Sequence, residues 1–199
     1  MAKVMTRTSA RWRVGVVDDH GPSRADVRAA VTAAGGEIAG EATRGADALA
    51  MITHARPDVA IFAAGLQDGD GVAAAAAVTS ATSCPVVLFT SHTREDLVAR
   101  AQAGGIMAYI LKPLRPAELA PTLDLAVARF TETRQLRQTL EERKIIERAK
   151  GRIMDRLNLT EEDAFRRLRR AAMNSRRPMV EIARALLVSE SVTEDLPRI

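Results

Sequence analysis

The chain has 199 residues, which is enough for one full domain and a smaller second one. Hydrophobic residues make up 47% and charged residues 27%, as in an ordinary soluble globular protein, and the aromatic share of only 3% predicts an aliphatic core. The net charge is +4 and is unevenly spread along the chain.

Cysteine usage and hydropathy exclude two broad classes of protein, those held by internal disulfides and those that span a membrane. Cys84 is the single cysteine, which excludes an internal disulfide framework and fits a reducing compartment. Its place before Pro85 and an apolar run indicates a buried structural thiol. No window approaches the ~20 apolar residues of a membrane span, and residues 1–13 lack the apolar core of a signal peptide. We therefore expect a cytoplasmic protein without a membrane partner.

Residues 1–12 show no periodicity and predict a loose tail, whereas from Arg13 short apolar runs alternate with helix-length segments. The runs, predicted as strands, are 13–17, 37–42, 58–63, 85–90 and 107–111. The predicted helices are 22–34, 44–55, 70–81, 93–103 and one that starts at 115. This alternation predicts an α/β domain over residues 13–125, a five-stranded doubly wound parallel sheet with ligands at the carboxyl ends of its strands.

The last helix of this domain has no stop signal before residue 157, because Pro121 lies in its first turns and Gly151 is its one glycine. We therefore predict a single long helix that leads into a second domain. Residues 126–140 form a helical connector that is mostly polar. Its main apolar residues are Leu136 and Leu140, so a short homodimer seam is one alternative.

Residues 141–188 predict a small three-helix domain, and residues 189–199 a second loose tail. The first helix carries an inner apolar stripe and ends at Asn158, which suits the left-handed position after a helix. The stripe consists of Ile146, Ala149, Ile153 and Leu157. Thr160 caps the second helix, with Phe165, Leu168 and Ala172 predicted on its inner face. Pro178 opens the third helix, whose inner residues are Ile182, Ala183, Leu186 and Leu187.

The second domain is strongly basic. Residues 143–185 contain 13 Lys or Arg and 6 Asp or Glu, so the remainder of the chain is slightly acidic. Six of the arginines lie between Ala164 and Val180 with no acidic residue among them. This asymmetry indicates a polyanionic partner, and a solvated basic helix face is the alternative.

Polar residues follow three of the predicted strands. Asp18 and Asp19 come after the first, Thr90 and Ser91 end the fourth, and Lys112 ends the fifth. These ends share one edge of a parallel sheet, so the side chains should converge. Two carboxylates can hold Mg²⁺ while a lysine and a hydroxyl contact a phosphoryl group. A Lys–Asp network that only ties the loops together explains the pattern equally well.

Residues 13–125 resemble a two-component receiver domain. The resemblance rests on VVDD (16–19), LFTS (88–91), Tyr109 and ILKP (110–113), which fall in order at fitting spacing. It implies the flavodoxin-like receiver fold and a phosphoacceptor aspartate at the end of the third strand, where this chain has Ala63. Tyr109 occupies the position of the family's switch aromatic, and we expect it to pack statically.

The alanine makes this a pseudo-receiver. A methyl group cannot form an acyl phosphate or bind a metal, so Asp18 and Asp19 are at best weak Mg²⁺ ligands, no cofactor is expected, and Lys112 should pair with the carboxylates. Asp68 and Asp70 lie too far along the next loop to replace the missing acceptor. We therefore expect control without phosphorylation, through a sensor or regulatory protein on the pseudo-receiver, through dimerisation or through abundance.

Residues 141–188 resemble the ANTAR domain, an RNA-binding antitermination module. The resemblance rests on AKG (149–151), the helix start at 160–165 and LRRAAM (168–173), followed by PMVEIARALL (178–187). It implies binding of an RNA stem-loop in a nascent transcript. The residues expected to contact RNA are Lys150, Arg152, Arg166, Arg167, Arg169, Arg170, Arg176 and Arg177. Arginine suits this task because its planar guanidinium binds phosphates and stacks on unpaired bases.

Glycine inside a helix, as at position 151, lowers the stability of the helix by about 1 kcal/mol relative to alanine. We expect a close approach, by another helix or by RNA backbone, to compensate.

Two other functions remain open: a DNA-binding response regulator, and a protein-interaction module whose partner covers the arginines. An enzyme is not expected, because His20, His54, His92 and Cys84 form no spaced catalytic set.

Overall fold

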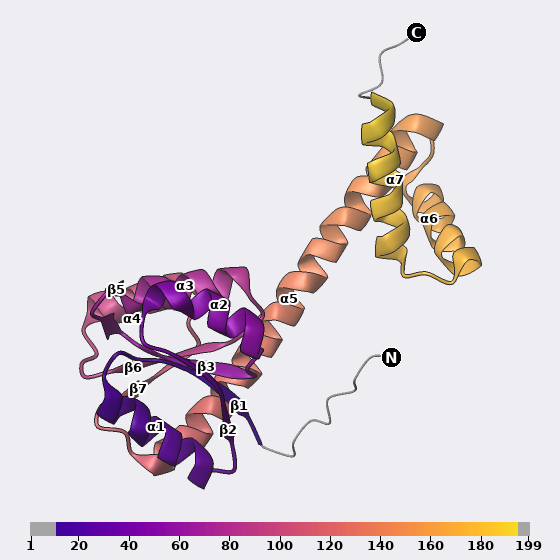
Figure 1. The fold of residues 1–199 in the computed structure, drawn as a ribbon. Helices are drawn as coiled ribbons and strands as arrows, with labels where there is room; N and C mark the ends of the chain where they lie inside the picture. Colours follow the sequence, from indigo (N-terminus) through magenta and orange to yellow (C-terminus); the bar gives the residue numbers. More distant parts are fainter. Residues whose placement is uncertain (1–10, 195–199) are drawn as a thin grey trace. The chain divides into compact units, whose positions relative to one another are not determined.

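The computed structural model describes residues 11–194 and divides the chain into two compact units, residues 1–132 and residues 133–199 (Figure 1). The boundary falls within one continuous helix. None of the described helices is long and apolar enough to cross a membrane.

The first unit is built on a parallel sheet whose strands follow the order β2-β1-β3-β6-β7. Its strands are β1 (Arg13–Val17), β2 (Glu37–Ala42), β3 (Val59–Ala63), β6 (Val86–Thr90) and β7 (Ala108–Leu111). Each predicted strand is confirmed to within one residue. The short antiparallel pair β4 (Gly65–Leu66) and β5 (Gly69–Asp70) was not predicted, because two-residue strands leave no periodic signal.

Helices cover both faces of the sheet, as parallel sheets require (Figure 1). The helices are α1 (Gly21–Ala33), α2 (Gly45–Ala55), α3 (Gly71–Ala81), α4 (Glu95–Ala103) and α5 (Pro116–Leu157). Side chains of α1 and of the start of α5 pack on one face, where Val16, Ile61 and Leu123 are fully or almost fully buried. Helices α2, α3 and α4 pack on the other, over Phe62 and Leu88. The core is aliphatic apart from a few aromatic rings.

Trp12 is a correction to the predicted tail. The indole is 5% exposed in the core beside α1 and α5, and its Nε1 donates a hydrogen bond to Asp124 Oδ1 at 3.0 Å. The amide of Arg11 also donates to the carbonyl of Gly35. Ordered structure therefore includes Arg11 and Trp12, and residues 1–10 lie outside the described part. Sequence periodicity did not predict this, because Asp124, the hydrogen-bond partner of Trp12, is 112 residues away along the chain.

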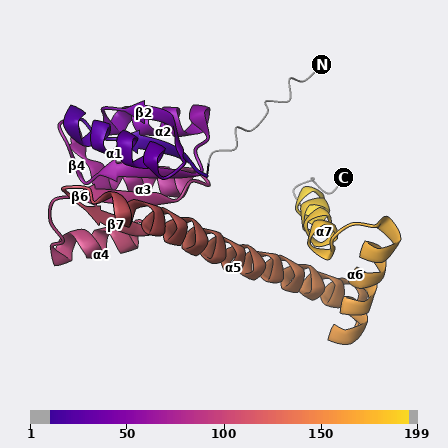
Figure 2. The ribbon, with the colours of Figure 1, turned by 90° about the horizontal axis from the view of Figure 1, so that it is seen from below.

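The second unit contains the end of α5 together with α6 (Glu161–Ser175) and α7 (Met179–Glu194). Helix α5 is unbroken over 42 residues, which confirms the long helix (Figure 2). Asn158 has a positive φ of 49°, and Thr160 Oγ1 accepts the Asp163 amide as the N-cap of α6, both as predicted. Helix α7 continues to Glu194, so the loose tail predicted from residue 189 is wrong, and residues 195–199 lie outside the described part.

The small core of this unit differs from the prediction at two positions, Phe165 and Leu157, and Leu157 is 43% exposed. Ala149, Ile153, Ala164, Leu168 and Ala183 are buried there. Phe165, predicted to point inward, is 40% exposed, and its neighbour Ala164 faces the core instead. A helical period of 3.6 residues places both near the edge of the inner face, and the packing of α5 and α7 selects the smaller side chain.

Candidate functional site

The polar residues at the carboxyl edge of the sheet converge around one ion pair. Lys112, directly after β7, places Nζ 2.9 Å from Asp18 Oδ2, and the Asp18 side chain is only 2% exposed. The ammonium also donates to Ser23 Oγ at 3.2 Å and lies 4.7 Å from the centre of the Phe89 ring. The buried carboxylate is therefore neutralised by the lysine, as predicted.

Asp19 and Thr90 are engaged by backbone groups. Asp19 Oδ2 accepts the amide of Gln67 at 2.7 Å, and the Thr90 hydroxyl donates to the carbonyl of His92 at 3.0 Å. Mg²⁺ prefers an octahedral set of oxygen ligands, with carboxylates free to coordinate it. Here one carboxylate is held by an ammonium and the other by an amide, so the residues present do not fit such an ion.

Ala63 is the last residue of β3 and is 2% exposed. Helix α3 begins immediately beside it: a Cβ added at Gly71 would lie 1.9 Å from the Ala63 carbonyl oxygen. Glycine is therefore required at position 71, and the end of β3 is tightly enclosed. The methyl group of Ala63 offers no oxygen to a phosphoryl group or to a cation.

The nearby acids Asp68 and Asp70 accept hydrogen bonds from backbone amides at the starts of α2 and α3. Asp68 accepts the amides of Gly45 and Ala46 at the start of α2, and these hydrogen bonds lower the pKa of its carboxyl group. Asp70 caps α3 and pairs with Arg100. Burial raises the pKa of Asp70, but the hydrogen bond from Arg100 and those from the α3 amides outweigh it, so the net shift is downward. Neither carboxylate replaces the one missing at Ala63.

Two further residues of this unit, His20 and Cys84, have structural roles. His20 caps α1 by accepting the amide of Ser23 through Nδ1, a role that the His20-Gly21-Pro22 sequence signals through the proline in the first turn. Cys84 is buried, as predicted, and burial together with the charge of Asp58 raises the pKa of its thiol to about 12.

Tyr109 lies on an exposed face of the first unit. The residue is 49% exposed, and its static packing stays a prediction. The residue borders a cleft of about 340 Å³ between α4, β7 and α5, whose apolar lining includes Leu97, Ile106 and Leu125. Leu111 and Leu125 are also more than 40% exposed. This face therefore presents apolar surface to solvent.

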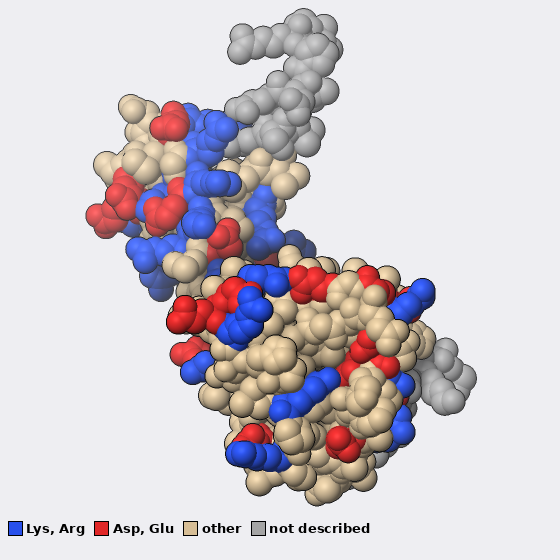
Figure 3. Space-filling view, turned by 90° about the vertical axis from the view of Figure 1, so that its left-hand side faces the viewer, with Lys and Arg blue, Asp and Glu red and all other residues tan. Residues whose placement is uncertain are grey.

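Helix α6 and the turn after it carry the exposed arginines, and Figure 3 shows Lys and Arg side chains gathered on the helical unit. Within the described residues no ion pair engages five of them: Arg167, Arg169, Arg170, Arg176 and Arg177. Arg166 is different, because it pairs with Glu162 at 2.7 Å and with Asp163 at 3.3 Å. Arg152 is exposed on α5. The basic surface is hereafter the five unpaired arginines.

Lys150 departs from the predicted set. It is 8% exposed, and its Nζ lies 2.5 Å from Glu147 Oε2 and 2.7 Å from Glu161 Oε1. These hydrogen bonds raise the pKa of the lysine and lower that of Glu161. The ammonium therefore ties α5 to the first turn of α6 and is not presented to solvent as a phosphate contact.

Gly151 lies next to this network on open surface. A Cβ added there would meet no described atom within 4 Å, so no other helix of the described residues approaches it. The helix-packing explanation of this glycine is wrong for the described chain.

Comparison with known proteins accounts for both units. Residues 14–124 match the response regulator receiver domain, and residues 134–187 match the ANTAR domain. The transcriptional regulatory protein PdtaR of Mycobacterium tuberculosis is 35% identical over 190 residues, which cover 92% of this chain and 93% of PdtaR. The nitrate regulatory protein of Klebsiella oxytoca is 44% identical over 63 residues, or 32% of this chain and 16% of that protein.

Among solved structures, the signal receiver domain of the response regulator NarL from Mycobacterium tuberculosis is 34% identical. The match covers 59% of this chain and 97% of that one, with a TM-score of 0.54. The structural similarity is therefore to the sheet unit, while PdtaR extends over both units.

Proposed function

Because the chain belongs to the response regulators, with a receiver domain followed by an ANTAR domain, we propose that it regulates transcription in the cytoplasm by binding stem-loop RNA and favouring antitermination. The basic surface on α6 and the following turn is the RNA contact. Lys150 stabilises the start of α6 through its ion pair with Glu161. Receiver control operates through protein contacts and without phosphorylation.

The observation that carries this proposal is the set of five exposed arginines without ion pairs in the described structure. An unpaired guanidinium loses no protein partner when it binds a phosphate, and its flat face stacks on unpaired bases. Arg166, already held by Glu162 and Asp163, contributes less. Phe165 and Met173, which are 40% and 69% exposed beside the arginines, add apolar surface for bases.

Crosslinking and sequencing of bound RNA tests the proposal. We expect Arg169→Ala/Arg170→Ala to lose the bound transcripts, whereas Arg134→Ala/Arg137→Ala on the connector removes the same charge and retains them. Equal recovery by both double variants would show that α6 is not the contact.

A salt titration separates RNA from the two competing functions. Single-stranded RNA loops should give a log–log slope of about −0.7 per phosphate contact. Stronger binding to duplex DNA than to hairpin RNA would favour a DNA-binding regulator. No salt-dependent binding to either would favour a protein-interaction module.

Phosphorylation independence is supported by Ala63, whose side chain has no oxygen, and by the pairing of Lys112 with Asp18. Incubation with acetyl phosphate and Mg²⁺ should give no shifted band on a Phos-tag gel, while an intact receiver domain run in parallel shifts. An acid-labile phosphorylated species of this chain would overturn the proposal.

Two protein contacts complete the proposal. Leu136 and Leu140, which are 61% and 58% exposed on α5, form a homodimer seam along the connector. The face around Tyr109, with its apolar cleft, binds a sensor or regulatory protein.

A further inference from the structure

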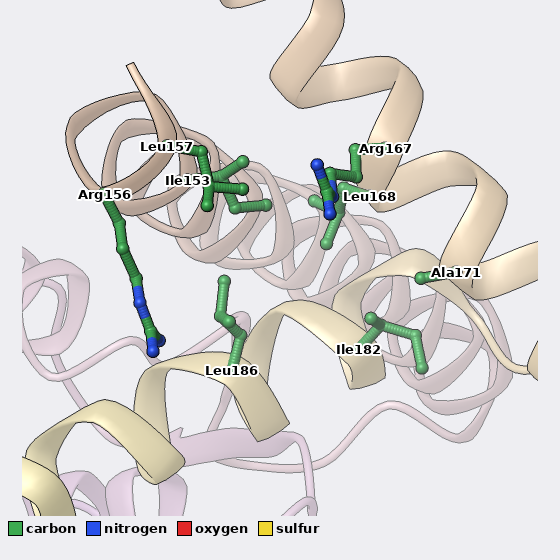
Figure 4. A pocket seen from close by; sticks show the side chains of 8 residues that line it. All are labelled: Ile153, Arg156, Leu157, Arg167, Leu168, Ala171, Ile182 and Leu186. Carbon is green, nitrogen blue, oxygen red and sulfur yellow. The ribbon is translucent and has the colours of Figure 1, made fainter. Parts of the chain in front are cut away.

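An apolar pocket opens in the second unit where the end of α5 meets α6 and α7 (Figure 4). Its volume is about 310 Å³. Pockets that bind small molecules commonly have volumes of about 300–1,000 Å³, and the spaces between bundled helices are among the places where they occur. The walls are the aliphatic side chains of Ile153, Leu157, Leu168, Ala171, Ile182 and Leu186. The pocket therefore has the size and the lining of a site for a small organic molecule.

The pocket is buried at its floor and open at its rim. Ile153 and Leu168 are 9% and 2% exposed and lie at the floor, whereas Leu157 at the rim is 43% exposed. Among the described lining residues, only the side chains of two arginines can form hydrogen bonds. A ligand with several polar groups would lose its hydrogen bonds to water here without replacing them. The part of the ligand that enters the pocket must therefore be hydrocarbon.

Arg167 supplies a positive charge at the edge of the pocket. Its side chain lies beside that of Leu168 (Figure 4), and no ion pair engages it within the described residues. Arg156 also lines the pocket, but it already has an interaction partner, so Arg167 is the cation assigned to the ligand. A planar guanidinium binds a carboxylate through two parallel hydrogen bonds. One positive charge matches the single charge of a carboxylate, whereas a phosphate monoester carries about −1.5 to −2 at pH 7.

We infer that this pocket binds a small amphiphilic carboxylate, whose aliphatic body lies on Ile153 and Leu168 and whose carboxylate pairs with Arg167. Arg167 also belongs to the basic surface, so the bound carboxylate occupies a guanidinium that RNA otherwise contacts. This competition rests on the proposed RNA-binding function, whereas the ligand site does not. The ligand gives a chemical input to a chain whose control, as proposed above, is independent of phosphorylation.

Isothermal titration of the full chain with octanoate tests the site. We expect octanoate to bind, octanol to bind about tenfold more weakly because it lacks the charge, and acetate to show no binding because it lacks the aliphatic body. Leu186→Trp fills the pocket and should abolish octanoate binding. Ala171→Leu is a second filling variant, and circular dichroism verifies that each variant keeps its helices. Arg167→Gln should lower the affinity for octanoate to that for octanol.

Arg148→Gln is the matched control, because it removes one positive charge from α5 outside the pocket. It should bind octanoate as the wild type does. The inference is overturned if octanoate does not bind the wild-type protein, if octanoate and octanol bind with equal affinity, or if octanoate binding survives in both folded filling variants.

A competition titration with hairpin RNA measures the consequence for the basic surface. Octanoate should weaken RNA binding a few-fold in the wild type and have no effect in Leu186→Trp. Octanoate binding with unchanged RNA affinity would overturn the competition while leaving the proposed function intact. Absence of RNA binding by the wild-type protein would instead overturn the proposed function, and the octanoate titration would still decide whether the site exists.

Discussion

At the residue scale, two lysines, Lys112 and Lys150, have different structural roles in the two units. Lys112 neutralises Asp18, a carboxylate that is almost completely buried. Lys150 bridges Glu147 and Glu161 and so links two helices. In both places the positive charge stabilises the fold, and neither lysine presents an uncompensated charge to a ligand.

Lys112→Ala should destabilise the sheet unit by about 2–3 kcal/mol, because it leaves the Asp18 carboxylate buried without its charged partner. Urea unfolding followed by the fluorescence of Trp12 measures this, since the only tryptophan is buried in that unit. Arg94→Ala removes an exposed pair with Asp96 in the same unit and should change its stability much less. Equal effects of the two substitutions would refute the role given to Lys112.

The Lys150–Glu161 pair predicts a pH dependence of the helical unit. The pKa of Glu161 is lowered by its hydrogen bond with Lys150, so the stabilisation is present above the ordinary glutamate pKa and is lost as the pH falls through the folded value. Hydrogen exchange of α6 should therefore be faster in Glu161→Gln than in the wild type near neutral pH. The difference should shrink below about pH 4. Glu181→Gln, in the first turn of α7, is the control and should show no such convergence.

At the element scale, α5 carries a glycine that nothing in the described chain explains. Gly151 lies within a 42-residue helix, and a methyl group there would meet open space. By contrast, Gly71 is needed because a methyl group would collide with the carbonyl of Ala63. A helix without an internal reason for glycine is consistent with an approaching partner, and RNA backbone is the partner proposed for this unit.

Gly151→Ala should have opposite effects on stability and on binding. The helical unit should become more stable to unfolding by about 1 kcal/mol, because alanine has a higher helix propensity than glycine. RNA affinity falls by a few-fold to about tenfold if backbone approaches this face, because the added methyl group separates the surfaces. Thermal unfolding and a filter-binding titration on the same variant measure the two. Higher stability with unchanged affinity would show that RNA does not approach Gly151.

At the scale of the whole molecule, one helix belongs to both units. Helix α5 packs on the sheet through Leu119 and Leu123, and its last turns supply Ala149 and Ile153 to the core of the helical unit. Between these ends its side chains are largely exposed, including Leu136 and Leu140. The segment that joins the units is therefore also the one available for pairing with a second copy.

Leu136→Asp should convert the proposed homodimer into a monomer, because it places a charge in the apolar seam. Sedimentation velocity over a range of concentrations measures the change. Gln138→Asp introduces the same charge on the opposite side of α5 and should leave the dimer intact. A wild-type protein that sediments as a monomer at all concentrations would contradict the connector seam directly.

Local sequence features were enough to predict the order and type of nearly all elements, the long helix, the α6 cap at Thr160 and the alanine at the end of β3. These features follow from local periodicity, from capping chemistry and from residue identity, none of which depends on distant contacts. Lys112 pairing with a carboxylate was also predictable, because the ends of parallel strands meet at one edge.

Which of two neighbouring side chains is buried depends on tertiary packing and could not be predicted from local patterns. Trp12 is buried and donates a hydrogen bond to Asp124. Ala164 rather than Phe165 lies on the inner face of α6, and Lys150 pairs with Glu147 and Glu161. The pocket between α5, α6 and α7 likewise depends on how these helices pack. The physical reason is the same throughout: a periodic pattern defines a helix face to within about one side chain, while the angles at which helices pack determine what that face contacts.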